Sequence, residues 1–312
     1  MKTVYVLGEL NVDMIITGTD VIPEWNREKL VDSFDIVLGS SSAITACALA
    51  GLGLDVRFVS VVGDDEFGNY CIEQLQSKGV NTDFIMKRQT AKTGVTLSLS
   101  TPQDRGLLTF MGSIPDLTPG DLPEALYEEA DHVHFGSYFL QDGMRDHWQE
   151  IFKQVRKNGA TTSFDTGWDV RNQWVREGIH SLLEETDLFI PSEEELLHIY
   201  GVPTLEDVWG LLPEGHHGVA VKRGSKGATL YSEDKRLVEI NSYMITPIDT
   251  TGAGDSFNAG LIHGYLNGKR DMELMLFANA CGALSTQRVG GAQRVSTLEE
   301  VKVFQNTHVV RD

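Results

Sequence analysis

Short apolar runs at regular intervals are the main pattern of this chain. The first, at residues 4–7, is continuous and stops at Gly8, which is typical of a strand buried on both faces. Beyond residue 120, such runs alternate with segments of helical spacing, for example 144–158 and 193–201. Strands that alternate with helices indicate right-handed crossovers and a mostly parallel sheet. The strands predicted in this part are His132–Phe135, Thr161–Phe164, Asp187–Ile190, Val219–Lys222 and Ala228–Tyr231.

Two other stretches carry strand patterns that do not alternate with helices. Residues 30–38 alternate apolar and polar positions, and the apolar positions of 94–111 are split by a turn signature at 101–106. We interpret these strands as a small antiparallel sheet that stands apart from the main sheet as a candidate lid. The prediction is therefore one α/β domain over residues 1–312, with a lid built from about 14–38 and 93–112.

A helix is expected after Gly39, where four small residues precede an apolar face that includes Cys47 and Leu54. The small residues allow a ligand to approach the backbone, and they equally allow tight helix packing. A further strand is predicted at 57–62. The acidic loop 63–68 then leads into a helix that ends near Gly79.

The charge of the chain limits its partners. The 312 residues are 41% hydrophobic and 23% charged, with a formal net charge of −19. Nucleic acid and anionic membranes attract clustered Lys and Arg, so neither is expected as a partner. A polyphosphate ligand stays open, because a metal ion and local N–H groups can neutralise it.

Cysteine usage and the N-terminal sequence indicate a cytoplasmic location. Cys47, Cys71 and Cys281 are distant from one another and odd in number, so we expect buried free thiols from a reducing compartment. Glu9 and the polar residues after it interrupt any signal-peptide core, and the sequence has no run of 18 apolar residues.

The stretch 249–262 carries the strongest chemical signal. Gly252, Ala253 and Gly254 are small enough for the main chain to approach a ligand, and an amphipathic helix starts at once. The N-terminus of a helix favours a phosphate or a developing negative charge. Asp255 at that end makes sense as a base that takes a proton from a hydroxyl group. It makes equal sense as a first-turn capping acid, so these residues alone leave both interpretations open.

Three other polar groups follow predicted strands. Asn11 and Asp13 come just after the first strand, where ligands gather in α/β sheets, although Asp13 also suits a turn. Residues 222–227, Lys-Arg-Gly-Ser-Lys-Gly, combine three cations with two glycines, which suits phosphate binding or a basic hairpin turn. The acids at 193–195 suit helix capping, and they also suit a hydrated Mg²⁺.

These pieces together resemble one family. The stretch 249–262 matches the C-terminal signature of the ribokinase-like (PfkB) carbohydrate kinases position by position, and the resemblance spans nearly the whole chain. The other elements fall in the family's order: Asn11 with Asp13, the Gly39 helix start, residues 62–68, the turn at 224–227, and the segment 290–293. The resemblance implies a three-layer sandwich with a mostly parallel central sheet flanked by helices, plus a small β-sheet lid.

The resemblance also implies the roles of the site residues. Asp255 would be the catalytic base, and the N–H groups of Gly252, Ala253 and Gly254 would form the anion hole for the transferring phosphoryl. The remaining roles follow from the resemblance alone. Asn11, Asp13, Gly39 and Ser40 would bind the sugar, and Lys222, Gly224, Ser225, Gly227 and Asn279 would bind ATP. Glu195 would bind Mg²⁺ indirectly, and Asp249 and Thr251 would bind a monovalent cation such as K⁺.

Several positions depart from the family pattern. Ser40 and Ile44 replace a glycine and an asparagine of the sugar-binding helix start, and Ser192 replaces the asparagine of N-x-x-E. At the D-x-N-x-R element the chain reads Asp165-Thr166-Gly167-Trp168, followed by Asp169, so that Trp168 is taken to replace an arginine that could meet an anionic substrate or a phosphate. The segment 135–137 lacks the glutamate of true ribokinases. These departures indicate retained chemistry with a remodelled substrate pocket.

The expectation is thus a kinase that uses MgATP to phosphorylate a hydroxyl of a small carbohydrate, such as fructose, ribose or 2-keto-3-deoxygluconate. A nucleoside kinase is an alternative, since Trp168 or Tyr138 could stack on a base. A non-catalytic sugar- or nucleotide-binding regulator is the alternative of another class. The apolar lid strands also suggest a homodimer formed through the lid.

Overall fold

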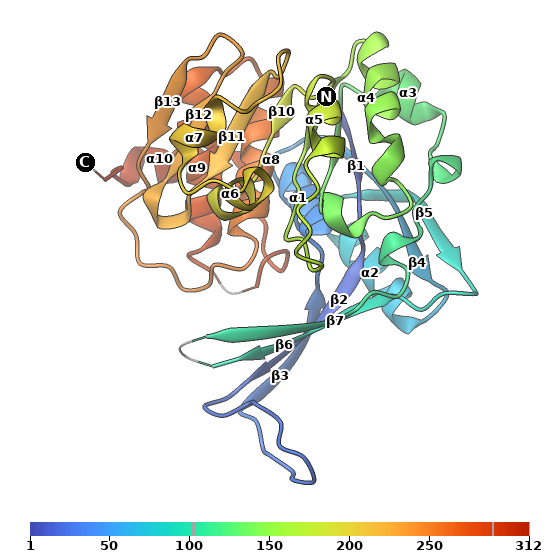
Figure 1. The fold of residues 1–312 in the computed structure, drawn as a ribbon. Helices are drawn as coiled ribbons and strands as arrows, with labels where there is room; N and C mark the ends of the chain where they lie inside the picture. The colour runs from blue at the N-terminus through green and yellow to red at the C-terminus, as the bar shows by residue number, and fades with distance from the viewer. Residues whose placement is uncertain (102–103, 289, 312) are drawn as a thin grey trace.

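A central sheet with helices on both faces forms the body of the protein. The computed structural model describes residues 1–101, 104–288 and 290–311. Within them, nine strands follow the order β13-β12-β11-β10-β9-β8-β1-β4-β5, and all neighbours are parallel except around β12 (Figure 1). The strands are β1 (Thr3–Leu7), β4 (Asp55–Gly63), β5 (Asn81–Arg88), β8 (His132–Phe135), β9 (Thr161–Phe164), β10 (Leu188–Phe189), β11 (Gly218–Lys222), β12 (Ala228–Tyr231) and β13 (Leu237–Ile240).

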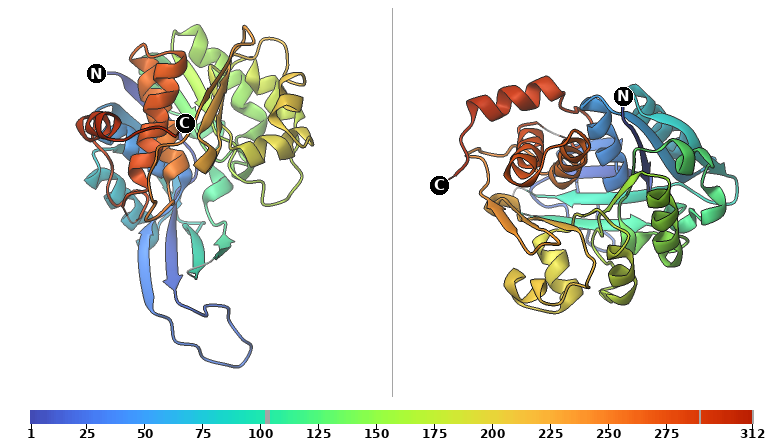
Figure 2. Two further views of the ribbon diagram at one scale, coloured as in Figure 1. Left: turned by 90° about the vertical axis from the view of Figure 1, so that its left-hand side faces the viewer. Right: turned by 90° about the horizontal axis from the view of Figure 1, so that it is seen from above.

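The continuous apolar run in β1 serves two cores, one on each face of the sheet. Side chains alternate across a strand, so Val4 and Val6 join one core while Tyr5 and Leu7 join the other. The first core is covered by α1 (Ser41–Gly51), α2 (Glu66–Ser77), α8 (Ala253–Leu266), α9 (Asp271–Ser285) and α10 (Leu298–Thr307). The second is covered by α3 (Ala125–Glu129), α4 (Trp148–Lys157), α5 (Glu177–Leu183), α6 (Glu193–Tyr200) and α7 (Leu205–Trp209). The two helical layers lie on opposite sides of the sheet in Figure 2, which confirms the predicted three-layer α/β class.

A separate four-stranded sheet projects from one end of this body (Figure 1). Its order is β3-β2-β6-β7, from β3 (Ser33–Leu38), β2 (Asn11–Thr17), β6 (Gly94–Ser100) and β7 (Arg105–Phe110). The predicted small sheet is confirmed, but the prediction that it is antiparallel is wrong at its centre, where β2 and β6 run parallel. β2 follows β1 and β6 follows β5, so both strands come directly from the main sheet and enter the small sheet from the same end.

The turn that joins β6 to β7 matches only part of its prediction. The Thr101 N–H donates to the Asp104 carbonyl at 2.8 Å, which closes the hairpin. Residues 102–103 of the expected turn lie outside the described residues. No helix in the described part of the chain is both long enough and apolar enough to cross a membrane.

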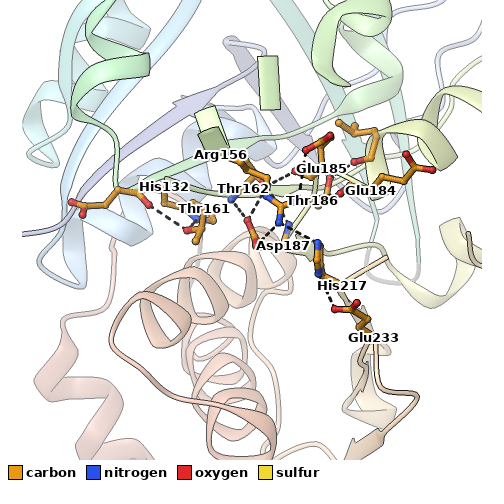
Figure 3. A network of polar contacts seen from close by, with 12 residues as sticks. His132, Arg156, Thr161, Thr162, Glu184, Glu185, Thr186, Asp187, His217 and Glu233 are labelled. Atoms are coloured by element: carbon orange, nitrogen blue, oxygen red, sulfur yellow. Dashed lines mark hydrogen bonds and ion pairs between the residues drawn. The ribbon is translucent and has the colours of Figure 1, made fainter. Parts of the chain in front are cut away.

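A polar network locks the amino ends of β9, β10 and β11 (Figure 3). Asp187 accepts hydrogen bonds from the Thr162 N–H at 2.8 Å and the Thr162 hydroxyl at 3.1 Å. Arg156 lies 3.7 Å from the Asp187 carboxylate and 3.1 Å from His217, which contacts Glu233 at 3.2 Å. This network braces the sheet at the edge opposite the carboxyl ends of the strands, so it leaves those ends to hold the site.

Candidate active site

The N-termini of two helices meet at Asp255. Helix α8 starts at Ala253 after Gly252, whose φ of 73° lies in the left-handed region that favours glycine. Helix α1 starts at Ser41, and the Ser41 hydroxyl donates a hydrogen bond to Oδ1 of Asp255. Thr45 of α1 also reaches the Asp255 carbonyl at 3.4 Å. Two positive helix ends therefore surround one carboxyl group, an arrangement that favours negative charge.

Burial raises the pKa of Asp255 to about 7. The Ser41 hydrogen bond and the Lys222 charge oppose this rise, and the charges of Asp165 and Glu9 add to it. A carboxyl group with a pKa near neutrality can both accept and release a proton at physiological pH, as a general base requires. A simple capping acid has no reason to carry such a shift, because its pKa is normally lowered by the helix end.

The loop before α8 is fixed by its own polar contacts. Asp249 accepts hydrogen bonds from the N–H groups of Thr251 and Gly290, each at 2.8 Å. Burial would raise the pKa of Asp249, but these N–H donors hold it below its ordinary value. Within the predicted anion hole, the Ala253 N–H donates to the Thr250 carbonyl at 3.2 Å, so that group is already occupied.

A cavity of about 370 Å³ opens beside this loop. Ala253 and Gly254 line it on one side, and apolar side chains such as Ile245 and Phe257 line another. Its volume suits a small-molecule or cofactor site. All five residues that the sequence assigned to ATP lie along it: Lys222, Gly224, Ser225, Gly227 and Asn279.

The basic turn at 222–227 has fewer free cations than its sequence suggested. Lys226 and Arg223 both form ion pairs with Glu193, at 3.0 and 3.4 Å, and Arg223 also pairs with Glu239. Lys222, at the end of β11, lines the cavity. Of the three cations, Lys222 is the one that lines the cavity, and it is itself paired with Asp165.

Lys222 belongs to a buried polar cluster under the helix ends. Its ammonium group contacts Oδ2 of Asp165, which also accepts a hydrogen bond from Asn258 at 2.7 Å. Burial alone would raise the pKa of Asp165, but the Lys222 charge holds it below its ordinary value. Burial lowers the pKa of a lysine, yet the Asp165 and Glu195 charges raise that of Lys222 overall. The two groups form an ion pair at the end of β9.

Glu195 lies beside this pair and caps its own helix. Its Oε2 accepts the Ser192 N–H at 2.8 Å and the Thr166 hydroxyl at 3.4 Å. Burial, followed by the Asp165 charge, raises the pKa of Glu195. Ser192 thus retains the capping role at its position, with its hydroxyl accepting the Glu195 N–H at 3.2 Å. No group of three or more His, Cys, Asp or Glu side chains suited to a metal gathers within the described residues.

The four residues assigned to the sugar converge at the root of the small sheet. Asn11 and Asp13 follow β1 of the main sheet, as predicted, and they also lie on β2, the strand that enters the small sheet. Asn11 donates to Asp13 at 2.9 Å, and a Cβ on Gly39 would lie 2.2 Å from the Asp13 carboxylate. Ser40, with a left-handed φ of 75°, donates to the Glu9 carbonyl at 2.6 Å. Burial raises the pKa of Asp13 to about 6.

The aromatic residues considered for base stacking differ in position. Tyr138 is 2% exposed and packs against Phe139 within the core, so it has no free face for a ligand. Trp168 is 43% exposed and packs edge-on against Trp174 and His198. Of the two rings, that of Trp168 is the more exposed.

Ile44, which stands where the family has an asparagine, lies next to the loops that surround Asp255. It is buried in α1, and its side chain lies 3.0 Å from the positions that a Cβ on Gly252 or on Gly291 would occupy. The residue therefore supports the loops next to Asp255 from beneath, and it lacks the polar atoms of the asparagine that it replaces.

Three polar residues of this region were absent from the predicted site. Asp165 was considered only as part of a family element, and Ser41 only as a small residue of a helix start. Glu9 was considered only as an interruption of a signal peptide. One sequence signal was available for Glu9, which directly follows an apolar strand and Gly8 at a carboxyl end.

The fold and these groups define a class of protein: an α/β kinase whose candidate base lies at a helix N-terminus beside a nucleotide-sized cavity. The chain belongs to the pfkB family of carbohydrate kinases, whose family model matches residues 1–298. Members of this family are phosphotransferases that act on sugar hydroxyls.

Individual relatives agree with this assignment. The chain is 30% identical over 309 residues to the ATP-dependent ribose-1-phosphate kinase of Halopiger xanaduensis, with coverage of 97% of this chain and 98% of that protein. It is 27% identical over 304 residues to the ribokinase of Bacillus subtilis, covering 97% and 99%. A solved Escherichia coli structure, provisionally named ribokinase II and bound to ATP and Mg²⁺, aligns with a TM-score of 0.85 at 27% identity, covering 99% and 100%.

Proposed function

We propose that this chain transfers the γ-phosphoryl group of MgATP to a hydroxyl of a small carbohydrate, with Asp255 as the general base. The observation that carries the proposal is the position of Asp255, where two helix N-termini meet beside the cavity and burial brings its pKa to about 7. A base is most efficient when its pKa lies near the working pH.

In this proposal, three groups of residues bind the carbohydrate, accept its proton and stabilise the transferring phosphoryl. Asn11 and Asp13, with Gly39 and Ser40 beside them, hold the hydroxyl groups of the carbohydrate. Asp255 takes the proton of the attacking hydroxyl. The Gly252 and Gly254 N–H groups receive the charge of the transferring phosphoryl, and Ala253 joins them once its bond to Thr250 opens. Most of the rate enhancement then comes from positioning and charge stabilisation.

The cavity along residues 222–227 is the proposed ATP site, with Asn279 at its far wall. Mg²⁺ would be held through its water shell by Glu195, because Mg²⁺ keeps most of its waters and is usually bound through one or two carboxylates. When bound, the ion neutralises phosphate charge. Asp249 and Thr251, with carbonyls near Gly291, form the proposed site for a monovalent cation such as K⁺.

The test is the Asp255→Asn variant of the purified protein. ATP consumption is first measured with free sugars, sugar acids and nucleosides. With an accepted substrate, Asp255→Asn should lower kcat at least about a hundredfold, the low end for a positioned base, and leave ATP affinity unchanged. Glu194→Gln, which neutralises an exposed acid of α6, should retain full activity as the control. Near-normal turnover in Asp255→Asn would overturn the assignment.

A nucleoside kinase is the second candidate, favoured by the exposed ring of Trp168. Trp168→Ala should weaken a nucleoside substrate by stacking loss of about 1–3 kcal/mol and leave a sugar substrate unaffected. Absence of turnover with every compound of the screen, together with sugar or ATP binding, would instead favour the non-catalytic regulator.

A homodimer formed through the small sheet, acting as a lid, is part of the proposal. Its strands expose large apolar side chains, including Phe34 at 54%, Leu108 at 62% and Phe110 at 57%. Apolar patches of this kind commonly mark an interface. A cytoplasmic location is also proposed, since Cys47, Cys71 and Cys281 are buried free thiols. Light scattering of Leu108→Asp against the unmodified chain tests the dimer.

A further inference from the structure

Glu9 is a buried carboxyl group in the connection between β1 and β2. It follows β1 and accepts hydrogen bonds from the Ser42 hydroxyl at 2.6 Å and the Ser137 hydroxyl at 2.9 Å. Ser137 and Ser40 both have left-handed φ angles, of 54° and 75°, and Ser40 donates to the Glu9 carbonyl. Strained backbone held by side-chain contacts is typical of functional sites. Glu9 therefore anchors the two loops that border the sugar, one at the start of α1 and one after β8.

The segment 39–42 brings three carboxyl groups together: Asp13 lies against Gly39, Asp255 accepts a hydrogen bond from Ser41, and Glu9 accepts one from Ser42. The Glu9 charge lies close enough to raise the pKa of both Asp13 and Asp255, in each case in addition to the larger effect of burial. The hydrogen-bond donors to the three carboxyl groups are hydroxyl, amide and backbone groups, from Ser41, Ser42, Ser137 and Asn11. The site is thus lined with acceptors and with neutral donors, the partners that sugar hydroxyls require.

Two cations act on this acidic set, and one of them, Lys222, is held by a carboxylate of the body. Lys222 lowers the pKa of Asp255, but its ammonium group is bound by Asp165 and lines the ATP cavity. Arg105 lowers the pKa of Asp13 from the exposed edge of β7.

The position where the family has the arginine of D-x-N-x-R carries an acid here. Counted from Asp165, that position is Asp169, and Trp168 stands one residue before it. Asp169 is 3% exposed and accepts hydrogen bonds from the N–H groups of Arg171, Gln173 and Trp174 at 2.7–2.9 Å. The loop that follows β9 therefore has the carboxylate of Asp169 where the family pattern has the guanidinium of an arginine.

We propose that the carbohydrate accepted by this site is uncharged, and that the acid set of Glu9, Asp13 and Asp255 excludes sugar acids and sugar phosphates. This inference rests on the proposed function. The names of the relatives include a ribokinase and a ribose-1-phosphate kinase, so the family assignment leaves the charge of the substrate open. An anion in this site would lie against carboxylates in a partly desolvated pocket, where like charges repel strongly.

The experiment compares matched pairs that differ by one anionic group. The pairs are D-fructose with 2-keto-D-gluconate, D-ribose with D-ribonate, and D-ribose with ribose 1-phosphate. The full chain is assayed with MgATP at pH 8. The uncharged member of at least one pair should exceed its partner by about a hundredfold in kcat/KM, as repulsion by two or more carboxylates implies. An equal or better anionic member would overturn the inference.

A binding arm separates this inference from the proposed function. Calorimetric titration of the same pairs is carried out with a non-hydrolysable ATP analogue present. Binding of uncharged members alone supports the inference even where no phosphoryl transfer occurs, in which case the proposed function fails by itself. Binding of the anionic members, or of none of the uncharged ones, counts against it.

Two variants locate the source of the preference. Glu9→Gln replaces one carboxylate by an amide of nearly the same shape. It should reduce the preference for the uncharged substrate roughly tenfold. Arg105→Gln, outside the acid set, should retain it. An anionic substrate whose turnover is lost in Arg105→Gln would identify that arginine as an anion receptor and refute the proposal.

Discussion

Asp255→Asn is expected to make the protein more stable at the pH at which it removes catalysis. In the folded protein burial raises the pKa of Asp255 from 3.8 to about 7. At about 1.36 kcal/mol per pH unit, this difference corresponds to roughly 4 kcal/mol of penalty for the ionised group. The side chain is not fully shielded from solvent, so we expect about half of that value, roughly 2 kcal/mol. Asn keeps an oxygen that can accept the Ser41 hydrogen bond, and it carries no charge.

The pH course of this effect has a defined sign. Between pH 4 and 7 the folded state binds more protons at Asp255 than the unfolded state does, so the unmodified protein loses stability as the pH rises. The Asn variant lacks this loss. Urea unfolding should therefore show no difference between the two proteins near pH 4, a growing advantage of the variant above it, and a plateau beyond pH 7.

Asp249→Asn is the matched control, because the pKa of Asp249 is shifted in the opposite direction. The N–H groups of Thr251 and Gly290 favour its ionised form, so its contribution is present at neutral pH and is lost as the pH falls. Asp249→Asn should thus lower the free energy of unfolding at pH 8. If both variants destabilise the protein equally at pH 8, the reasoning about Asp255 is refuted.

Two further predictions concern the partners of the same cluster. Ser41→Ala removes the hydrogen bond that lowers the pKa of Asp255, so the acid limb of the kcat/KM profile should move to higher pH by about one unit, the equivalent of about 1.4 kcal/mol; an unmoved limb contradicts this role. Lys222→Met leaves Asp165 as an uncompensated buried charge and should cost about 3–5 kcal/mol in urea unfolding, of which Asp165→Asn in the same chain should recover most. A cost that persists in the double variant would show that Lys222 acts through packing.

The sequence pattern was sufficient for the main sheet where strands are short, apolar and buried. It missed β5 and β13. β5 carries polar residues at its exposed positions and a register irregularity against β4, and β13 is a partly exposed edge strand. Neither presents the continuous apolar run that marks β1.

The direction of β2 against β6 could not be predicted, because strand orientation depends on where each chain segment leaves the main sheet. The residues of the site also differ in whether the sequence could predict them. Asp255 was predictable because its motif is contiguous. Its partner Ser41 is 214 residues distant in sequence, and only the packing of α1 against α8 brings them together.

The strand β2 belongs to the small sheet, and yet it continues directly from β1 of the main sheet. Asp13 therefore belongs to the small sheet, whereas Asp255 belongs to the body through α8. A molecule that contacts both carboxyl groups at once therefore binds best at one particular angle between the two sheets. If the free protein prefers a more open angle, the substrate binds more weakly. The apparent Kd equals the intrinsic Kd divided by the fraction of molecules that already have the closed angle. Substitutions of Gly8 or Leu10, which flank Glu9 in the connection between β1 and β2, would then alter substrate affinity without contacting the substrate.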